Sequence, residues 1–405
     1  MRLYEFEAKE LLKKYGIPIP KGILVNSVGS INQTALQIKA PSVVKAQILS
    51  NTRGKAGGIV ICNSKKETIV AANSLLGKNI LNEKVTSVII EEKADIKSEH
   101  YIAITYDTDY RTPILVIAKQ GGIDVEELTA RKRESITKKG INVLEGLKED
   151  EIKFALKEAG FDLNAIEKIT PVVEQLWNCF SHEDCRLLEI NPLAITNSKE
   201  VIAVGALFDL DDDATYKHKD RAYAPRQAGL NRTPTERELE VKKANDVDYR
   251  GTVKYTELDG DIGVMSAGGG GSITCMDALI TSGGKPSNLT EFSGNPSDEK
   301  IYVLMKAILS KPGLNGLWIV GATANFTDVH VTMQGIVKAL EELQPKIPIV
   351  VRRSGPNEKE GLQLLKNASL KNKWDLECFG AEKPMTATAG IIARNAREFR
   401  LKNKK

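Results

Sequence analysis

The sequence has no long apolar segment, no paired cysteine motif and no cluster of histidines. No apolar run is long enough to span a bilayer, and Met1 leads directly into an amphipathic stretch, so we expect neither a membrane span nor a signal peptide. The five cysteines are odd in number and lack CxxC spacing, which favours reduced thiols and argues against a zinc site. The four histidines are scattered, so we assign none as a nucleophile or metal ligand. These absences predict a cytoplasmic protein.

The composition is typical of a globular protein, with 41% hydrophobic and 27% charged residues. At about 100–200 residues per domain, a chain of 405 residues corresponds to roughly two to four domains. The 57 basic and 53 acidic residues nearly balance and leave a formal net charge of +4. This balance indicates no surface for nucleic acid or for a membrane.

A basic loop rich in glycine lies between two predicted strands near the N-terminus. Lys45 belongs to the first strand, and the loop contains Arg53, Gly54 and Lys55. Glycines let backbone N–H groups approach phosphate oxygens, and the cations can neutralise them. The pattern predicts a phosphate-binding loop, although a mobile basic hairpin has the same composition.

Polar residues mark other predicted strands of the N-terminal half. Glu91 and Glu99 lie at strand edges, where a carboxylate can either accept hydrogen bonds from ribose hydroxyls or remain a solvated charge. Glu189 and Asn191 alternate within the apolar strand 186–196, so they face the same side. Burying both without a partner would be unfavourable, and a substrate or an oxygen-liganded cation such as Mg²⁺ would satisfy them.

From about Tyr255 onward, predicted strands and helices alternate, which implies a parallel sheet covered on both faces. Ligands of such sheets bind beyond the carboxyl ends of the strands. In the stretch 317–328 an apolar strand ends, and Asn325 and Thr327 precede a helix. The first N–H groups of that helix favour an anion, unless the two side chains only cap it.

Other segments predicted at the same edge have compatible chemistry. Ser293 and Gly294 follow one strand, and Arg352 and Arg353 end another. Paired arginines are usually surface charge, but guanidinium groups next to an apolar strand can bind carboxylates bidentately. This edge therefore suits a multiply charged carboxylate.

Three N-terminal motifs resemble the ATP-grasp half of the β subunits of acyl-CoA synthetases, of which succinyl-CoA synthetase is the best known. The motifs are VVKAQ at 43–47, RGKAGG at 53–58 and LEINPL at 188–193. The resemblance implies that ATP phosphates are held by Lys45, Arg53, Gly54 and Lys55, and that the nucleoside contacts Glu91 and Glu99.

The same resemblance implies a magnesium site and a link to a second chain. Asn191 would bind Mg²⁺, and Glu189 would orient a phosphohistidine supplied by a partner. In this family an Asp on the following strand supplies another metal ligand, but the matching position here is Gly205. Asp209, in the acidic run 209–213, could take its place unless that run is a solvated turn.

The C-terminal half is similar to ATP-citrate lyase and citryl-CoA synthetase. The shared motifs are ANFT at 324–327, VRRxGPN at 351–357, where x is Ser354, and MTA at 385–387. This similarity implies that citrate is bound by Ser293, Gly294, Asn325, Thr327 and Arg353.

Together the two resemblances predict an α/β chain of two domains. An N-terminal ATP-grasp fold (1–240) would precede a flavodoxin-like, doubly wound parallel-sheet domain of the CoA-ligase type (250–405). The implied reaction is ATP-dependent ligation of citrate to CoA through citryl phosphate. The partner would be an α-type subunit that carries the phosphohistidine and the CoA-binding domain, with or without a fused citryl-CoA lyase domain. We therefore expect a hetero-oligomer that is inactive without this partner.

Two other functions stay open at this point. The acid could be succinate or malate, as in succinyl-CoA or malyl-CoA synthetases. The chain could also be a regulatory subunit that binds nucleotide or carboxylate without catalysis, an alternative that Gly205 supports.

Overall fold

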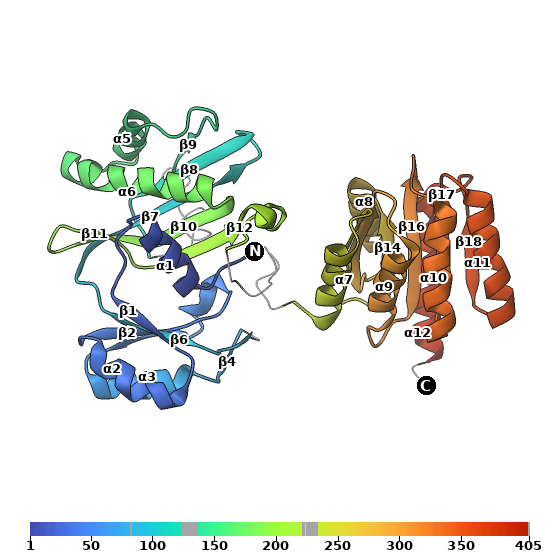
Figure 1. Ribbon diagram of the computed structural model, residues 1–405, viewed down its shortest axis with the longest axis horizontal. Coiled ribbons are helices and arrows are strands. Elements are labelled where there is room, and N and C mark those ends of the chain that lie inside the picture. The colour runs from blue at the N-terminus through green and yellow to red at the C-terminus, as the bar shows by residue number, and fades with distance from the viewer. Residues whose placement is uncertain (82, 123–135, 221–222, 224–233, 404–405) are drawn as a thin grey trace. The chain divides into compact units, whose positions relative to one another are not determined.

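The computed structural model describes residues 1–81, 83–122, 136–220, 223 and 234–403. The chain forms two compact units, Met1–Thr233 and Pro234–Lys405, each with its own sheets and core (Figure 1). Among the described residues, no helix combines the length and the apolarity needed to cross a bilayer.

The first unit begins with helix α1 (Glu5–Lys14), as predicted. Tyr4 is its N-cap residue, and the backbone N–H of Tyr4 donates to the Glu7 carboxylate. Gly16 follows the helix with a φ of +74°, a left-handed conformation that glycine adopts without strain. Ala8, Leu11 and Leu12 of α1 are buried, and so are the charged residues Glu5, Glu7 and Lys9.

A small antiparallel sheet has the strand order β1-β6-β2-β3. Its strands are β1 (Gly22–Val25), β6 (Val88–Glu92), β2 (Ser42–Ala46) and β3 (Ile59–Cys62). The strands share a core with helices α2 (Ile31–Gln37) and α3 (Lys65–Leu75). The short strands β4 (Asn79–Ile80) and β5 (Glu83–Lys84) pair with each other. Short 3₁₀ turns lie at η1 (Val28–Ser30) and η2 (Asn51–Arg53).

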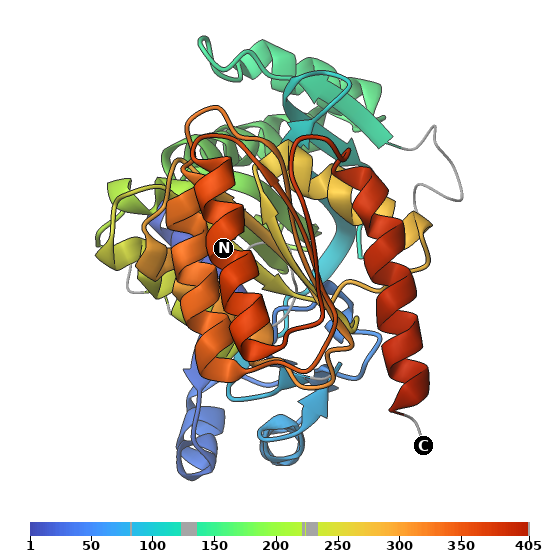
Figure 2. The ribbon, with the colours of Figure 1, turned by 90° about the vertical axis from the view of Figure 1, so that its right-hand side faces the viewer.

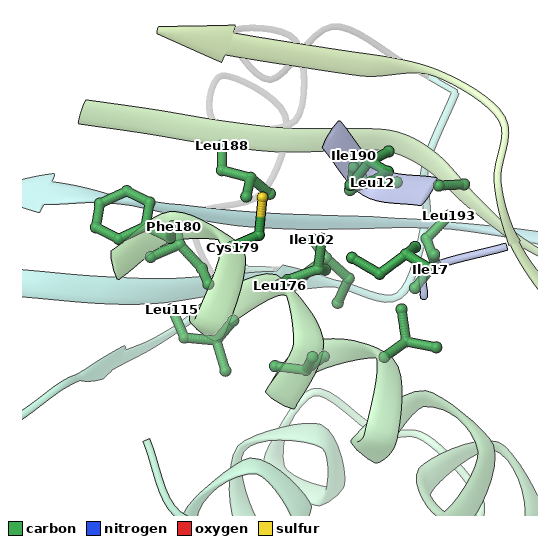
Figure 3. Packing of buried hydrophobic residues seen from close by; sticks show 14 of the residues in the cluster. Leu12, Ile17, Ile102, Leu115, Leu176, Cys179, Phe180, Leu188, Ile190 and Leu193 are labelled. Atoms are coloured by element: carbon green, nitrogen blue, oxygen red, sulfur yellow. The ribbon is translucent and has the colours of Figure 1, made fainter. Parts of the chain in front are cut away.

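A larger antiparallel sheet of this unit has the order β11-β10-β7-β8-β9, with β12 also paired to β10. Its strands are β7 (Ile96–Asp107), β8 (Thr112–Ala118), β9 (Ile136–Gly140), β10 (Cys185–Thr196), β11 (Val201–Ala203) and β12 (Ala206–Leu210). Helices α5 (Glu149–Glu158) and α6 (Leu163–His182) share its core, and η4 (Asp212–Lys217) follows β12. Figure 3 shows Leu176, Cys179 and Phe180 of α6 beside Leu188 and Ile190 of β10.

The second unit contains a sheet of order β13-β15-β14-β16-β17-β18. The strands are β13 (Thr252–Glu257), β14 (Ile262–Ala267), β15 (Asn288–Ser293), β16 (Gly316–Thr323), β17 (Ile349–Ser354) and β18 (Leu376–Phe379). All neighbours are parallel except β13, which runs antiparallel to β15 at one edge. Without β13, the order in sequence terms is 2-1-3-4-5, as in flavodoxin-like folds. The parallel sheet was predicted, but its antiparallel edge was not.

Helices cover both faces of this sheet. They are α7 (Glu236–Val247), α8 (Gly269–Thr281), α9 (Asp298–Leu309), α10 (Val329–Leu343), α11 (Glu358–Asn372) and α12 (Ala389–Lys402), with a short turn η5 (Thr386–Thr388). One core contains side chains from α7, α9, α10 and α11, and the other contains side chains from α8 and α12. Figure 2 shows α12, next to the C-terminal label, across the strands from the orange helices. On the α12 side, buried Trp318 of β16 donates its indole N–H to Thr388 at 3.0 Å.

Helices α9 and α10 approach each other closely at Gly335. A Cβ atom at this position would lie 2.2 Å from the carbonyl oxygen of Asp298. We expect Gly335→Ala to lower the stability by about 1–3 kcal/mol, because the helix contact must shift to admit the methyl group. Gly271→Ala is the matched control in α8, where a Cβ atom has nothing within 4 Å. Gly271→Ala should leave the free energy of unfolding unchanged or raise it by up to about 1 kcal/mol. Calorimetric unfolding of both variants measures this. If Gly335→Ala changed the free energy of unfolding as little as Gly271→Ala does, the close packing at Gly335 would be contradicted.

Candidate functional site

A cavity of about 570 Å³ lies between the two sheets of the first unit. The ends of β2 and β3, the loop 52–55, the start of β7 and the Asn191–Pro192 segment form its walls. A smaller pocket of about 90 Å³ shares several of these residues. The residues assigned from the sequence that border the larger cavity are Lys45, Arg53, Gly54, Lys55, Glu99 and Asn191. The structure thus brings most of the predicted nucleotide residues together.

The loop after β2 is folded tightly by hydrogen bonds within itself. Ser50 accepts from the Thr52 N–H, and the Gly58 N–H donates to the Arg53 carbonyl at 2.7 Å. Gly57 has a φ of +76°, which a side chain would strain. A Cβ atom at Gly58 would lie 3.0 Å from the Arg53 carbonyl oxygen. The glycines therefore let this loop fold tightly while Arg53 and Lys55 border the cavity.

Lys45 and Arg53 share a carboxylate that the sequence analysis did not identify. Glu5 lies 2.9 Å from the Lys45 ammonium, 2.8 Å from that of Lys9, and in contact with the Arg53 guanidinium. Burial alone would raise the pKa of Glu5, but the charges of Arg53, Lys45 and Lys9 hold it well below its usual range. Burial alone would lower the pKa of Lys45, and Glu5 and Glu91 raise it above its usual value. Burial lowers the pKa of Lys9, and the charges of Glu5 and Glu91 offset this only in part. Glu5 and Lys45 are therefore charged at neutral pH.

The two carboxylates assigned to the nucleoside have different positions. Glu99 is exposed and borders the cavity, beside Gly122. Glu91 is only 2% exposed and is paired with Lys9 and Lys45, at 2.9 Å from the latter. Glu91 therefore belongs to the ion-pair cluster beneath the cavity, and a nucleoside hydroxyl cannot reach it without breaking these pairs.

Glu189 and Asn191 border the same small pocket, in agreement with their alternation along β10. The side-chain oxygen of Asn191 accepts from the Gly122 N–H at 2.8 Å, and oxygen atoms are the ligands that Mg²⁺ prefers. Mg²⁺ commonly takes only one or two protein ligands and fills its shell with phosphate oxygens and water. Asn191 fits that role. Within the described residues, no cluster of three or more His, Cys, Asp or Glu side chains could enclose a metal.

Asp209 does not contribute to this site. It lies in β12, not in a solvated turn, and Arg2 donates to both of its carboxylate oxygens at 2.8 and 2.7 Å. Nor can position 205 carry a carboxylate in this backbone, because a Cβ atom there would lie 2.2 Å from the Asn191 carbonyl oxygen. The protein therefore offers the metal fewer ligands than the sequence comparison implied.

In the second unit, two adjacent arginines at the end of β17 have opposite environments. Arg352 donates to the carbonyls of Lys383 and Gly321, both at 2.7 Å. Arg353 is fully buried, and none of its three guanidinium nitrogens has a hydrogen-bond partner. Its guanidinium carbon lies 5.1 Å from the centre of the Phe292 ring. Burial, together with the charge of Arg352, lowers the pKa of Arg353 to about 10. A buried cation without a counter-ion is a strong indication of a missing anion.

Asp328 connects the loops that carry the residues assigned to the acid. Its backbone N–H donates to Asn295 at 3.0 Å, and its carboxylate accepts from Asn357 at 2.7 Å and from the Val331 N–H at 3.1 Å. Ser293 and Gly294 precede Asn295, Asn325 and Thr327 precede Asp328 itself, and Arg353 precedes Asn357. The carboxyl ends of β15, β16 and β17 therefore form one connected edge, as predicted.

Comparisons with known proteins agree with both halves of this geometry. The sequence profile of the ATP-grasp domain matches residues 2–195, and that of the ATP citrate lyase citrate-binding domain matches residues 232–394. The β subunit of the ADP-forming succinate–CoA ligase of Methanocaldococcus jannaschii is 32% identical over 377 residues, which cover 93% of this chain and 97% of that protein. The chain belongs to the succinate–CoA ligase β-subunit family. It is an acid–CoA ligase subunit with an ATP-grasp domain.

Other members of the family and two solved structures extend the comparison. The GDP-forming enzyme's β subunit from Thermus thermophilus is 32% identical over 365 residues, 90% of this chain and 93% of its own. The ATP citrate lyase of Methanothrix soehngenii, solved with citrate and coenzyme A, superposes with a TM-score of 0.78 at 26% identity, covering 98% and 99% of the two chains. The Methanosaeta concilii enzyme, solved with (3S)-citryl-CoA, gives 0.76 at 25% identity over 96% and 98%.

Three residues of this ligase-family chain were missed from the sequence. Glu5 and Lys9 are four residues apart and lie on a face of α1 that is otherwise apolar, which is the one local signal for a buried ion pair. Asp328 was read only as part of a helix start, and its links to Asn295 and Asn357 join residues about 30 positions apart. Contacts of that range leave no periodic pattern in a sequence.

The two arginines of β17 allow a direct test of the unpaired cation. We expect Arg353→Met to stabilise the ligand-free chain by about 1–3 kcal/mol, because it replaces an unpaired buried charge with apolar volume. Arg352→Met should destabilise it by a similar amount, because the carbonyls of Lys383 and Gly321 lose their charged donor. Calorimetry of both variants checks this, and a lower melting temperature for Arg353→Met would show that the guanidinium has a partner in solution.

Proposed function

We propose that this chain is the β-type subunit of an ATP-dependent citrate–CoA ligase. With its partner it would convert citrate, CoA and ATP into citryl-CoA, ADP and phosphate. Citryl phosphate would be the intermediate from which CoA displaces phosphate. The partner would be an α-type subunit that supplies the phosphorylated histidine and the CoA-binding domain.

The unpaired guanidinium of Arg353 carries the choice of acid. A carboxylate would supply the counter-ion that it lacks, and its complete burial means that an anion reaches it only when the covering side chains move. Succinate and citrate both have terminal carboxylates, but citrate adds a third carboxylate and a hydroxyl. The loops joined by Asp328 offer additional donors in Asn325 and Thr327, which suits the larger acid. The match of residues 232–394 to a citrate-binding profile supports the same choice.

The first unit would hold the nucleotide. Lys45, Arg53 and the backbone of the loop at Gly54 and Lys55 would bind the phosphates, and Glu99 would accept from the ribose. Mg²⁺ would neutralise phosphate charge, with Asn191 as its protein ligand. Glu189, which accepts from the Tyr101 hydroxyl at 3.3 Å, would orient the incoming histidine of the partner. The rate enhancement would come chiefly from positioning and electrostatic stabilisation.

Succinate is the second candidate acid, and the curated relatives favour it. Their names are those of succinate–CoA ligase β subunits at 32% identity over more than nine tenths of this chain. That similarity includes the ATP-grasp half, which both kinds of ligase need, so it discriminates the acid less well than the site in the second unit.

A substrate panel on the reconstituted complex tests the proposal. We expect kcat/KM for citrate to exceed that for succinate by roughly tenfold or more, because each charge-assisted hydrogen bond contributes about 1.5–3 kcal/mol. Arg353→Lys should raise KM for citrate by a similar factor and leave KM for ATP unchanged, since a lysine keeps the charge but loses the bidentate geometry.

A preference for succinate, or an unchanged citrate KM in Arg353→Lys, would overturn the choice of acid. Transfer of ³²P from ATP to the partner histidine separates a ligase from a binding subunit. Citrate binding without any such transfer at saturating Mg²⁺ would identify a regulatory protein.

A further inference from the structure

Two cations that border the nucleotide cavity, Lys45 and Arg53, are paired with one carboxylate of the same chain. Glu5 comes from the first turn of α1, its side chain is 0% exposed, and it borders both the large cavity and the small pocket. It contacts Lys45 at 2.9 Å and Arg53 through its other oxygen. A carboxylate with two oxygens on these two cations has the same donors that a phosphate group would use.

The cluster has a defined charge balance. Lys9, Lys45 and Arg53 contribute three positive charges, and Glu5 and Glu91 contribute two negative ones, so the net charge is +1. Without Glu5, the three cations and Glu91 would together have a formal net charge of +2. Two charges 4 Å apart interact by several kcal/mol at the effective dielectric constant of a protein, about 20. Glu5 therefore weakens the attraction of this site for polyphosphate substantially.

Lys9 gives Glu5 a partner that does not border the cavity. It lies 2.8 Å from Glu5 and also contacts Glu91, and it is 3% exposed. When phosphate oxygens replace Glu5 on Lys45 and Arg53, the carboxylate stays paired with Lys9. Lys45 also donates to the Val204 carbonyl at 2.8 Å, a hydrogen bond that does not involve Glu5. No charge is left buried and unpaired in either state.

We propose that Glu5 is a positioning residue that acts as an internal counter-ion for Lys45 and Arg53 and thereby limits the affinity of the site for nucleotide. In the empty site it keeps both cations ordered at the cavity wall. In the occupied site it lowers the affinity for ADP, so that the product leaves. This inference rests on the proposed assignment of the cavity to a nucleotide.

The test uses the complete complex and measures Kd for ADP by calorimetry, together with kcat and KM for ATP. Glu5→Gln keeps the shape of the side chain and removes its charge. We expect it to tighten ADP binding about tenfold or more, to lower KM for ATP and to lower kcat where product release limits turnover. Lys9→Met removes the alternative partner of Glu5, so the carboxylate stays on Lys45 and Arg53, and ADP should bind about tenfold more weakly.

Glu91→Gln is the matched control, because it makes the same change of charge in the same cluster at a residue that does not contact Arg53. We expect it to tighten ADP binding less than Glu5→Gln does. If the cluster only maintained the fold, every one of these variants would bind ADP more weakly. Weaker or unchanged ADP binding by a folded Glu5→Gln complex overturns the inference. Equal tightening of ADP binding in Glu91→Gln and Glu5→Gln also overturns it. If Glu5→Gln does not fold, Glu5→Asp decides instead. Its carboxylate is shorter by one methylene and withdraws from Lys45 and Arg53, so ADP should bind more tightly, and unchanged or weaker ADP binding overturns the inference. A wild-type complex that binds neither ATP nor ADP would instead refute the nucleotide assignment itself.

Discussion

The burial of cations is the constraint on which both candidate sites depend. A guanidinium or ammonium group removed from water is unfavourable unless an anion or several carbonyl groups compensate it. In the first unit the compensation is internal, since Glu5 and Glu91 pair with Lys9, Lys45 and Arg53. In the second unit Arg353 has none. The charges of the first site therefore compensate one another without a ligand, whereas the buried charge of Arg353 is uncompensated.

The parallel sheet of the second unit and the loop of the phosphate site could be predicted because their signals are local. Apolar strands alternating with helical periodicity define the sheet, and clustered glycines with Arg53 and Lys55 define the loop. The same reasoning correctly placed Glu189 and Asn191 on one face, since both border one pocket. It also predicted that Asn325 and Arg353 lie at the same edge of the sheet, because the carboxyl ends of parallel strands meet there.

Other parts of the site could not be predicted because they depend on long-range pairing. Glu91 looked like a strand-edge carboxylate, but α1 brings Lys9 from 82 positions away to pair with it. Asp209 was a candidate metal ligand, with a solvated turn as the alternative, but Arg2, 207 positions away, donates to both of its carboxylate oxygens. Helix α6 and the antiparallel strand β13 had no assignment from the sequence. For Glu91 and Asp209 the decisive neighbour is remote in sequence.

Gly321 and Arg353 constrain each other across neighbouring strands. A methyl group at position 321 would lie 2.1 Å from a guanidinium nitrogen of Arg353, and the Gly321 carbonyl also accepts from Arg352. A homologue with a larger residue at 321 must therefore place this arginine side chain differently or lack it. The two positions should co-vary across the family, so the residue pair found there offers a criterion for sorting uncharacterised members by the acid they accept.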